Sequence, residues 1–376
     1  MKTNRLTFSR FFILMLSLLL ISQAFAQESS SDSSNIDYNE GPHVYWQNDS
    51  TINVLYYCSD SLIINSLAYS NSLEFSGLCN DSHVMYKIAS NYTQYPSYRL
   101  GSVPRIFAVS DLHGEFEYFE ELLVNAKIID KDRHWIYGDG HLIIVGDVFD
   151  RGDKVTECLW LIYLLEQEAI KAGGQVHLLL GNHEIMVLRG DDRYIHEKYL
   201  QGISRKSRIE HRDLFGRDME LGRWLRTKPA ALVINDVLFT HGGIAPYYAQ
   251  NSFNLDSLNR LAANCIDISS AEKAFDDEKN HFLRSLGPYW YRGYQMSIES
   301  RYPETTPDEM TSILDYYKVH TIVVGHSEND SIMTFQNNRV IGIDVPVFDL
   351  DGLHGLLIED GKFFIVNQQG KTSLLK

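Results

Sequence analysis

Residues 142–152 read LIIVGDVFDRG, and this stretch sets the pattern for the rest of the chain. Four apolar residues, Leu142 to Val145, precede a glycine and then acidic and basic side chains. This order is typical of a buried strand that ends in a polar loop. It recurs on both sides, as IFAV followed by SDLHG at 106–114 and as VHLLL followed by GNHE at 176–184.

Stretches with helical apolar spacing separate these strands. They lie at 116–126 and 155–169, and a further helix is expected after Leu180. Strand, turn and helix therefore alternate, which predicts an α/β fold with right-handed crossovers. In such a fold ligand groups gather beyond the carboxyl ends of the strands, so we expect the chemistry in the loops that follow them.

The later half of the chain adds apolar strands and closes on a hairpin. The strands are expected at Ala231 to Ile234, Val237 to Phe239 and Thr321 to Val324. The hairpin pairs 356–358 with 363–366 around Asp360-Gly361, because Asp-Gly between two apolar runs favours a tight turn.

The first hundred residues have a different character. Lys2, Arg5 and Arg10 precede an apolar run at 11–21 and the small residues of Ala24-Phe25-Ala26, so residues 1–26 read as a signal peptide cleaved near Gln27. An uncleaved membrane anchor is the alternative, but the run is shorter than the roughly 20 residues that a spanning helix needs. We therefore expect an exported, periplasmic or secreted protein without stable membrane insertion.

The segment after the signal peptide divides by composition. Residues 27–43 are rich in Ser, Asp and Asn and predict a flexible linker, with order starting near Val44. Residues 44–100 carry short alternating stretches and predict a small β-rich extension that packs against a main domain at 101–376.

Four cysteines remain after the predicted cleavage, and an oxidising compartment would permit disulfides. We expect Cys58 to pair with Cys79, because both lie in the extension. Cys158 lies in an apolar helical pattern and is expected to be a buried free thiol.

The net charge excludes one class of partner. The chain of 376 residues carries a formal charge of −15, which would repel a nucleic-acid backbone over most of the surface. Any anionic substrate must therefore be held by local cations.

Side chains that suit metal ions follow each expected strand end. Asp111 and His113 are two residues apart and would point the same way in an extended segment. Asp147 is placed to bridge two cations roughly 3.5–4 Å apart. Asn182 is a neutral oxygen ligand. His241 and His326 follow two later strands, where a solitary imidazole is more often a capped turn residue.

Three further groups suit phosphate chemistry. Arg151 can take two phosphate oxygens in a bidentate grip, although an Asp-Arg surface ion pair is the simpler interpretation of Asp150-Arg151 in isolation. His183 can give a proton to a leaving oxygen, and a carboxylate such as Asp150 can orient that imidazole.

Taken in order, the motifs DLHG, GDVFDRG, GNHE, HGG and GH resemble the phosphoprotein phosphatase branch of the metallophosphoesterase superfamily over residues 105–345. The segments DDRY at 191–194 and GPYWYRG at 287–293 resemble its bacterial, Shewanella-like subgroup. The resemblance implies a calcineurin-like fold of two facing mixed β-sheets with helices outside and the metals at one edge. Ser110 departs from the glycine usual before the first Asp, and we expect this change to be tolerated.

The resemblance also implies a role for each matching residue. Asp111, His113 and Asp147 would hold the first metal. Asp147, Asn182, His241 and His326 would hold the second. His183 would be the general acid oriented by Asp150. Phosphate would be bound by Arg151 and Asn182, with Arg292 as a second arginine that stacking among its tyrosine neighbours explains nearly as well.

The predicted activity is hydrolysis of phosphate monoesters by water held between two divalent metal ions, with Mn²⁺ first and iron or zinc as alternatives. The partner is a phosphorylated protein, peptide or small phosphate ester. The subgroup favours phosphotyrosine, whose ring the aromatic residues at 289–294 would stack on. One rival is hydrolysis of nucleotides or dinucleoside polyphosphates. A rival of another class is a non-catalytic protein that binds or senses phosphate ligands, which would be marked by a damaged metal set or a missing acid.

Overall fold

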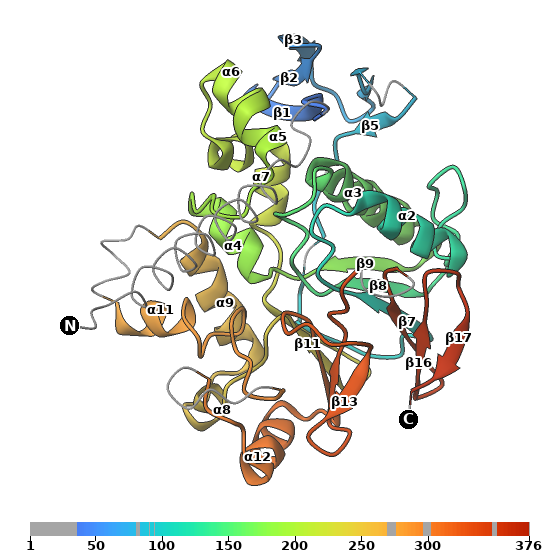
Figure 1. Cartoon of the computed structure of the whole chain (residues 1–376), viewed down its shortest axis with the longest axis vertical. Helices are drawn as coiled ribbons and strands as arrows, with labels where there is room; N and C mark the ends of the chain where they lie inside the picture. The colour runs from blue at the N-terminus through green and yellow to red at the C-terminus, as the bar shows by residue number, and fades with distance from the viewer. Residues whose placement is uncertain are drawn as a thin grey trace, which may run out of the picture. The chain divides into compact units, whose positions relative to one another are not determined.

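The computed structural model describes residues 36–79, 83–89, 91–93, 95–268, 276–295, 302–347 and 352–375. The predicted signal peptide and residues 27–35 of the predicted linker lie outside these ranges. Tyr38–Lys376 forms one compact unit (Figure 1). No helix among the described residues is long and apolar enough to cross a bilayer.

Two six-stranded mixed sheets form the centre of the unit, as predicted. In the first, β7 (Arg105–Val109), β8 (His141–Ile144) and β9 (Gln175–Leu178) are parallel, and β15 (Gly355–Glu359) joins β7 antiparallel. The expected hairpin is confirmed, because β15 pairs with β16 (Lys362–Val366). Strand β17 (Thr372–Leu374) completes that edge.

The second sheet has a similar parallel core. Strand β11 (Val237–Thr240) pairs parallel with β12 (Thr321–Val324), which pairs parallel with β14 (Val340–Gly342). Around them, β13 (Met333–Phe335) pairs antiparallel with β14, and β10 (Ala231–Ile234) pairs antiparallel with β11. Strand β6 (Arg99–Leu100) pairs parallel with β10, so the domain boundary predicted at residue 100 falls inside this sheet.

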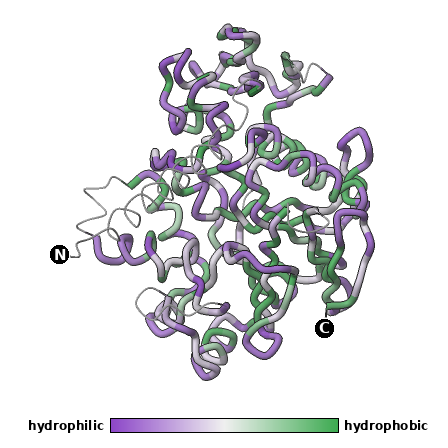
Figure 2. Tube along the Cα trace, viewed as in Figure 1, coloured by the Kyte–Doolittle hydropathy of each residue, from purple (hydrophilic) through white to green (hydrophobic). Residues whose placement is uncertain are grey.

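Alternation along the strands explains how the layers pack. Ile106, Ile143 and Leu232 belong to a buried cluster that joins residues of both sheets, so the two sheets face each other. Phe107 and Leu142 point to the opposite side and belong to the larger core with the helices. Hydrophobic segments accordingly concentrate at the sheets and hydrophilic ones in the surrounding loops (Figure 2).

Helices α2 (Phe116–Asn125) and α3 (Val155–Ala172) follow β7 and β8, as their sequence spacing predicts. Helix α4 (Asn182–Leu188) follows β9. The remaining helical segments are α5 (Glu197–Tyr199), η2 (Leu200–Ser204), α6 (Arg205–Ser207), η3 (His211–Phe215), α7 (Glu220–Leu225), α8 (Pro246–Gln250), α9 (Leu255–Ile266), α11 (Asp277–Phe282) and α12 (Pro307–Tyr317).

The N-terminal region is β-rich and packs against the rest, as predicted. Strands β1 (Glu40–Asn48), β2 (Thr51–Cys58) and β3 (Ser61–Ala68) form an antiparallel sheet, and β4 (Glu74–Ser76) pairs with β5 (Met85–Lys87). The Cys58–Cys79 disulfide is present, and Cys158 is a buried free thiol. Glu220 on α7 fastens the region, because its carboxylate accepts hydrogen bonds from Trp46 Nε1 (2.6 Å) and Tyr92 Oη (3.1 Å).

Order begins earlier than the composition of the linker predicts. Strand β1 starts at Glu40 rather than near Val44. The Glu40 side chain is fully buried and lies 3.1 Å from the buried Lys198 ammonium. Thr156 Oγ1 also donates to it. This ion pair joins residues far apart in the chain, so local composition could not reveal it.

Replacing Glu40 by glutamine should lower the free energy of unfolding by about 3 kcal/mol at neutral pH, because Lys198 loses its main buried partner. Burial alone would raise the pKa of Glu40, but the Lys198 charge, with smaller contributions from His43 and Thr156, outweighs burial and lowers the pKa to about 2. The stabilisation is therefore complete above pH 4.5 and is lost as the pH falls toward 2. Urea unfolding measured across this range checks both statements.

Glu74→Gln is the matched control. The Glu74–Lys87 ion pair spans 3.7 Å and both side chains are exposed, so its loss should cost less than about 0.5 kcal/mol. Equal destabilisation by the two variants would contradict the assignment of Glu40.

Candidate metal centre

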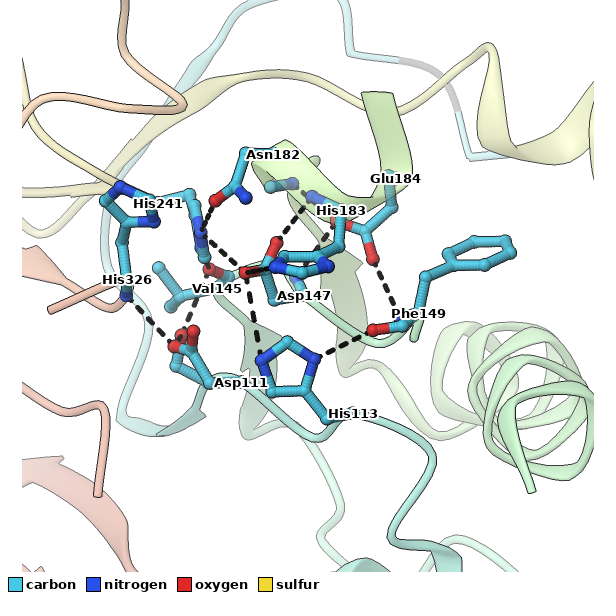
Figure 3. A network of polar contacts seen from close by, with 12 residues as sticks. Asp111, His113, Val145, Asp147, Phe149, Asn182, His183, Glu184, His241 and His326 are labelled. Carbon is cyan, nitrogen blue, oxygen red and sulfur yellow. Dashed lines mark hydrogen bonds and ion pairs between the residues drawn. The ribbon is translucent and has the colours of Figure 1, made fainter. Parts of the chain in front are cut away.

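Asp147 lies at the centre of a buried group of histidines (Figure 3). Its Oδ2 atom is 3.1 Å from His241 Nε2, 3.8 Å from His183 Nε2 and 4.0 Å from His113 Nε2. His113, Asp147 and His241 lie in the loops after β7, β8 and β11. His183 is the second residue of α4, the helix that follows β9. The strand-end arrangement expected from the sequence therefore brings them together.

Two of these imidazoles are oriented by backbone carbonyls. His113 Nδ1 lies 2.8 Å from Phe149 O, and His241 Nδ1 lies 2.7 Å from Val145 O. A carbonyl only accepts hydrogen bonds, so Nδ1 carries the proton in both rings. This leaves Nε2 of the neutral ring free to bind a cation beside Asp147.

His183 has a different partner. Its Nδ1 atom lies 2.6 Å from Oδ2 of the buried Asp150 carboxylate. Burial alone would lower the pKa of His183, but the Asp147 and Asp150 carboxylates outweigh burial and raise it. By contrast, burial lowers the pKa of His113 to about 3. The two rings therefore suit different tasks, proton donation for His183 and cation binding for His113.

Asn182 extends the group around His241. His241 Nε2 lies 3.0 Å from Asn182 Oδ1 as well as 3.1 Å from Asp147 Oδ2. Burial opposes protonation of His241, but Asp147 raises its pKa to about 10. A cation that replaced this proton would meet the same nitrogen and the same two oxygens, since a ligating imidazole must be unprotonated.

Asp111 and His326 meet at the edge of the group. Asp111 Oδ2 accepts from the His326 backbone N–H (3.1 Å) and lies 2.5 Å from Ser110 Oγ. The Ser110 hydroxyl thus has a defined place beside Asp111. The Nε2 atom of His326 is buried and has no hydrogen-bond partner among the described residues. An unpaired buried nitrogen is costly, and a bound cation would satisfy it.

The segment from Ser110 to His113 is not extended, which corrects one step of the sequence argument. Asp111 has φ 53° and His113 has φ 45°, so they do not share a face by strand alternation. Asp147 (φ 56°) and His326 (φ 65°) are also left-handed. Such conformations cost about 1 kcal/mol or more each and concentrate at functional sites.

Close approach explains two of the glycines in the motifs. A Cβ atom at Gly181 would lie 2.2 Å from Asp147 Oδ1, and one at Gly325 would lie 2.0 Å from Ser110 Oγ. Either contact is far below van der Waals separation. Any side chain at these positions would displace the groups that form the site.

Glu184 has a positioning role that the sequence argument did not assign. Its carboxylate accepts from the N–H groups of Gly181 (2.6 Å), Asp147 (2.9 Å) and Val148 (2.7 Å). It thereby fastens the loop after β8 to the start of α4. The signal was present, because Glu184 is the third residue of that helix, where a carboxylate caps free N–H groups.

Asp344 is a second residue that the sequence argument missed. It follows β14 in the second sheet and is almost fully buried. Burial and the nearby Asp111 carboxylate raise its pKa well above the ordinary value. A carboxyl directly after a buried strand was the available signal, but no motif drew attention to it.

The two candidate arginines differ in whether their guanidinium groups already have hydrogen-bond partners. Arg151 is exposed, and its side chain has no polar partner among the described residues, which leaves the guanidinium free for a ligand. Arg292 donates from Nη1 to His326 O (2.6 Å) and to Ser327 Oγ (3.1 Å). Arg292 therefore lies beside the site, but its Nη1 atom is already engaged in these two hydrogen bonds.

The tyrosines at 289–294 do not line the site, contrary to expectation. Tyr289, Tyr291 and Tyr294 are buried, and their rings belong to the main core. Their hydroxyl groups explain part of this, since Tyr294 Oη donates to Ile244 O at 2.6 Å. Trp290 is half-buried, and its ring centroid is 5.9 Å from that of His326.

The donor atoms form two groups that share Asp147. One joins His113, Asp147 and His183, and the other joins Asp147, His241 and His326, with the atoms of each within 4.8 Å of one another. Asp111 belongs to neither group. Imidazole nitrogens and carboxylate oxygens suit manganese, iron and zinc alike. The residues present therefore fit divalent cations, as expected from the sequence.

Comparison with known proteins shows the family. The model of the calcineurin-like phosphoesterases matches residues 104–328. The chain belongs to this family. It is 28% identical over 263 residues to Shewanella-like protein phosphatase 1 of Plasmodium berghei (strain Anka), which covers 68% of this chain and 70% of that protein. As a family member with phosphatase relatives, the chain is a hydrolase that acts on phosphate esters.

Two further relatives have different activities in their names. The crystal structure of the cold-active protein-tyrosine phosphatase of a psychrophilic Shewanella species superposes with a TM-score of 0.81 at 33% identity, covering 90% of this chain and 99% of that one. The symmetrical bis(5'-nucleosyl)-tetraphosphatase of Pasteurella multocida (strain Pm70) is 25% identical over 286 residues, which is 69% of this chain and 95% of that enzyme. Similarity is thus higher to the phosphatase than to the tetraphosphatase.

Proposed function

We propose that this phosphoesterase hydrolyses phosphate monoesters, with phosphotyrosine in proteins or peptides as the favoured substrate class, and that it uses two divalent cations. The observation that carries the proposal is the single carboxylate of Asp147 shared by two groups of donor atoms. The name of the Shewanella relative supports phosphotyrosine. Mn²⁺ is the first candidate metal, with iron and zinc as alternatives.

In this proposal His113 and Asp147, with Asp111 beside them, hold one cation. Asp147, Asn182, His241 and His326 hold the other. When bound, divalent cations neutralise charge on the phosphate and lower the pKa of water. Side chains of this chain bind the phosphate oxygens and deliver the proton to the leaving oxygen.

Arg151 binds the phosphate oxygens, because its guanidinium is exposed and can form two parallel hydrogen bonds. Arg292 contributes a second cation beside His326. His183 Nε2 delivers a proton to the leaving oxygen, since Nδ1 is engaged by Asp150. Asp150 holds the ring in place and stabilises its protonated form.

The test is phosphate release by the purified protein after chelation and reloading with Mn²⁺, Zn²⁺ or Fe²⁺. The substrates are matched phosphotyrosine, phosphoserine and phosphothreonine peptides and a dinucleoside tetraphosphate. We expect metal-dependent release that is fastest with phosphotyrosine. Activity confined to the tetraphosphate would establish the nucleotide-hydrolase alternative, and metal-loaded protein inert on all substrates would overturn the enzymatic proposal.

We also propose that the protein is exported, on the basis of its N-terminal sequence and the Cys58–Cys79 disulfide. N-terminal sequencing of protein from a fractionated host should give a start near Gln27 in the exported fraction. A cytosolic protein that retains Met1 and has free thiols at both cysteines would contradict export.

A further inference from the structure

Tyr194 lies beside the proposed general acid with its ring half in solvent. Its exposed fraction is 50%, and its ring centroid is 5.5 Å from that of His183. An exposed aromatic residue is unremarkable by itself. Here the ring packs against the His183 imidazole, which the buried Asp150 carboxylate holds in place and which is the proposed proton donor.

The backbone at Tyr194 is also fixed to the phosphate-binding loop. Its carbonyl oxygen accepts from the Arg151 N–H at 2.9 Å. The preceding Arg193 donates two hydrogen bonds of 2.7 Å to the Asp191 carboxylate, and its guanidinium carbon is 5.6 Å from the Tyr194 ring centroid. The ring thus has a defined position at the rim of the site.

The chemistry of His183 determines which part of a substrate comes near this ring. Since Asp150 engages Nδ1, the proton leaves from Nε2. The leaving oxygen must then approach Nε2 within roughly 2.6–3.2 Å. In a phosphotyrosine this oxygen is bonded directly to the phenyl ring. That phenyl ring is therefore brought close to the His183 imidazole, against which the half-exposed Tyr194 ring packs.

Other aromatic residues near the centre do not compete for this role. The tyrosines at 289–294 are buried, and Trp290 contacts His326 rather than His183. Among the described residues, Tyr194 is the exposed aromatic side chain with a ring contact to the proposed acid.

We propose that Tyr194 is the surface on which the aromatic ring of an aryl phosphate packs, and that it sets the preference for aryl over alkyl phosphates. The inference rests on the proposed monoesterase function and adds a specificity-determining residue to it. Aromatic pairs of this kind are worth a few-fold to about 10-fold in affinity. Phosphoserine has no ring and gains nothing from Tyr194.

The experiment compares kcat and KM for matched phosphotyrosine and phosphoserine peptides in Tyr194→Ala, Tyr194→Phe and the wild type. The alanine variant should lower the aryl-to-alkyl ratio of kcat/KM about 5-fold, mainly through KM for the aryl peptide. The phenylalanine variant should restore the ratio, because it keeps the ring. Tyr316→Ala, at an exposed tyrosine on α12, is the control and should leave the ratio unchanged.

Inhibition by inorganic phosphate separates packing from an indirect effect through Arg151. Phosphate carries no ring, so its inhibition constant should be the same in Tyr194→Ala and the wild type. An equal fall for both peptides, or weaker phosphate inhibition, would overturn the proposal in favour of a structural role. A wild type that hydrolyses phosphoserine but not phosphotyrosine would also overturn it, while leaving the monoesterase function intact.

Discussion

Asp147→Asn should lower kcat/KM by more than about 1,000-fold and remove most of the bound metal. Asparagine keeps the shape of the side chain. Its carbonyl oxygen can still accept the hydrogen bond that the His183 backbone N–H donates to Asp147 Oδ1 at 3.0 Å. What disappears is the negative charge shared by both groups of donor atoms. Losing charge stabilisation at a metal centre costs several kcal/mol, and each 1.4 kcal/mol is tenfold in rate.

The measurements are phosphate release, metal content by mass spectrometry, and thermal unfolding in the presence of a chelator. Unfolding of the chelated proteins shows whether the variant is folded independently of metal. Asp360→Asn makes the same chemical change in the exposed hairpin turn between β15 and β16 and should leave activity and metal content unchanged. Full metal content with more than a tenth of the activity in Asp147→Asn would contradict a shared, bridging carboxylate.

Elements with a strong local pattern could be predicted from the sequence. Strand β8 and its neighbours are runs of buried apolar residues that end in glycine and polar side chains, and these features are local. The chain order then placed the polar clusters at one edge, because parallel strands share the direction of their carboxyl ends. For this reason Asp147, His183 and His241 were found as candidates, and the structure brings them together.

Features that depend on long-range contacts could not be predicted. The positive φ angles of Asp111 and His113 are maintained by backbone hydrogen bonds to another loop, such as His113 N–H to Asp147 O at 3.0 Å. The buried Glu40 carboxylate at the start of β1 is paired with Lys198, a residue in a distant segment. No local window of sequence contains either cause.

Composition was a misleading guide to which aromatic residues could contact a substrate, because some of them belong to the hydrophobic core. The segment at 289–294 has the composition of a binding surface, but its tyrosines are buried in the core. The hydroxyl groups of two of them find internal acceptors, Pro303 O at 3.1 Å for Tyr291 and Ile244 O at 2.6 Å for Tyr294. Tyr194, one tyrosine in a charged segment, is the aromatic residue that lies beside the proposed acid. Sequence alone does not distinguish a buried tyrosine from an exposed one.

The second large effect is expected from His183→Asn, and its size should depend on the leaving group. An alkoxide such as that of serine is strongly basic and needs a proton as the bond breaks, so kcat/KM for a phosphoserine peptide should fall about 1,000-fold. The p-nitrophenolate ion is stable without a proton, so p-nitrophenyl phosphate should lose less than about 10-fold. Rates for a series of aryl and alkyl phosphates, plotted against leaving-group basicity, measure this dependence.

This dependence decides between two roles that the geometry allows for His183. Its Nε2 lies 3.8 Å from Asp147 Oδ2, close enough for the ring to belong to a metal group, and its Nδ1 lies 2.6 Å from Asp150 Oδ2, which favours a protonated ring. Asp150→Asn should show the same trend with a smaller loss, because the ring remains but its protonated form is less stable. If His183→Asn slowed good and poor leaving groups equally and lost metal, His183 would be a ligand and the proton would have to come from another group.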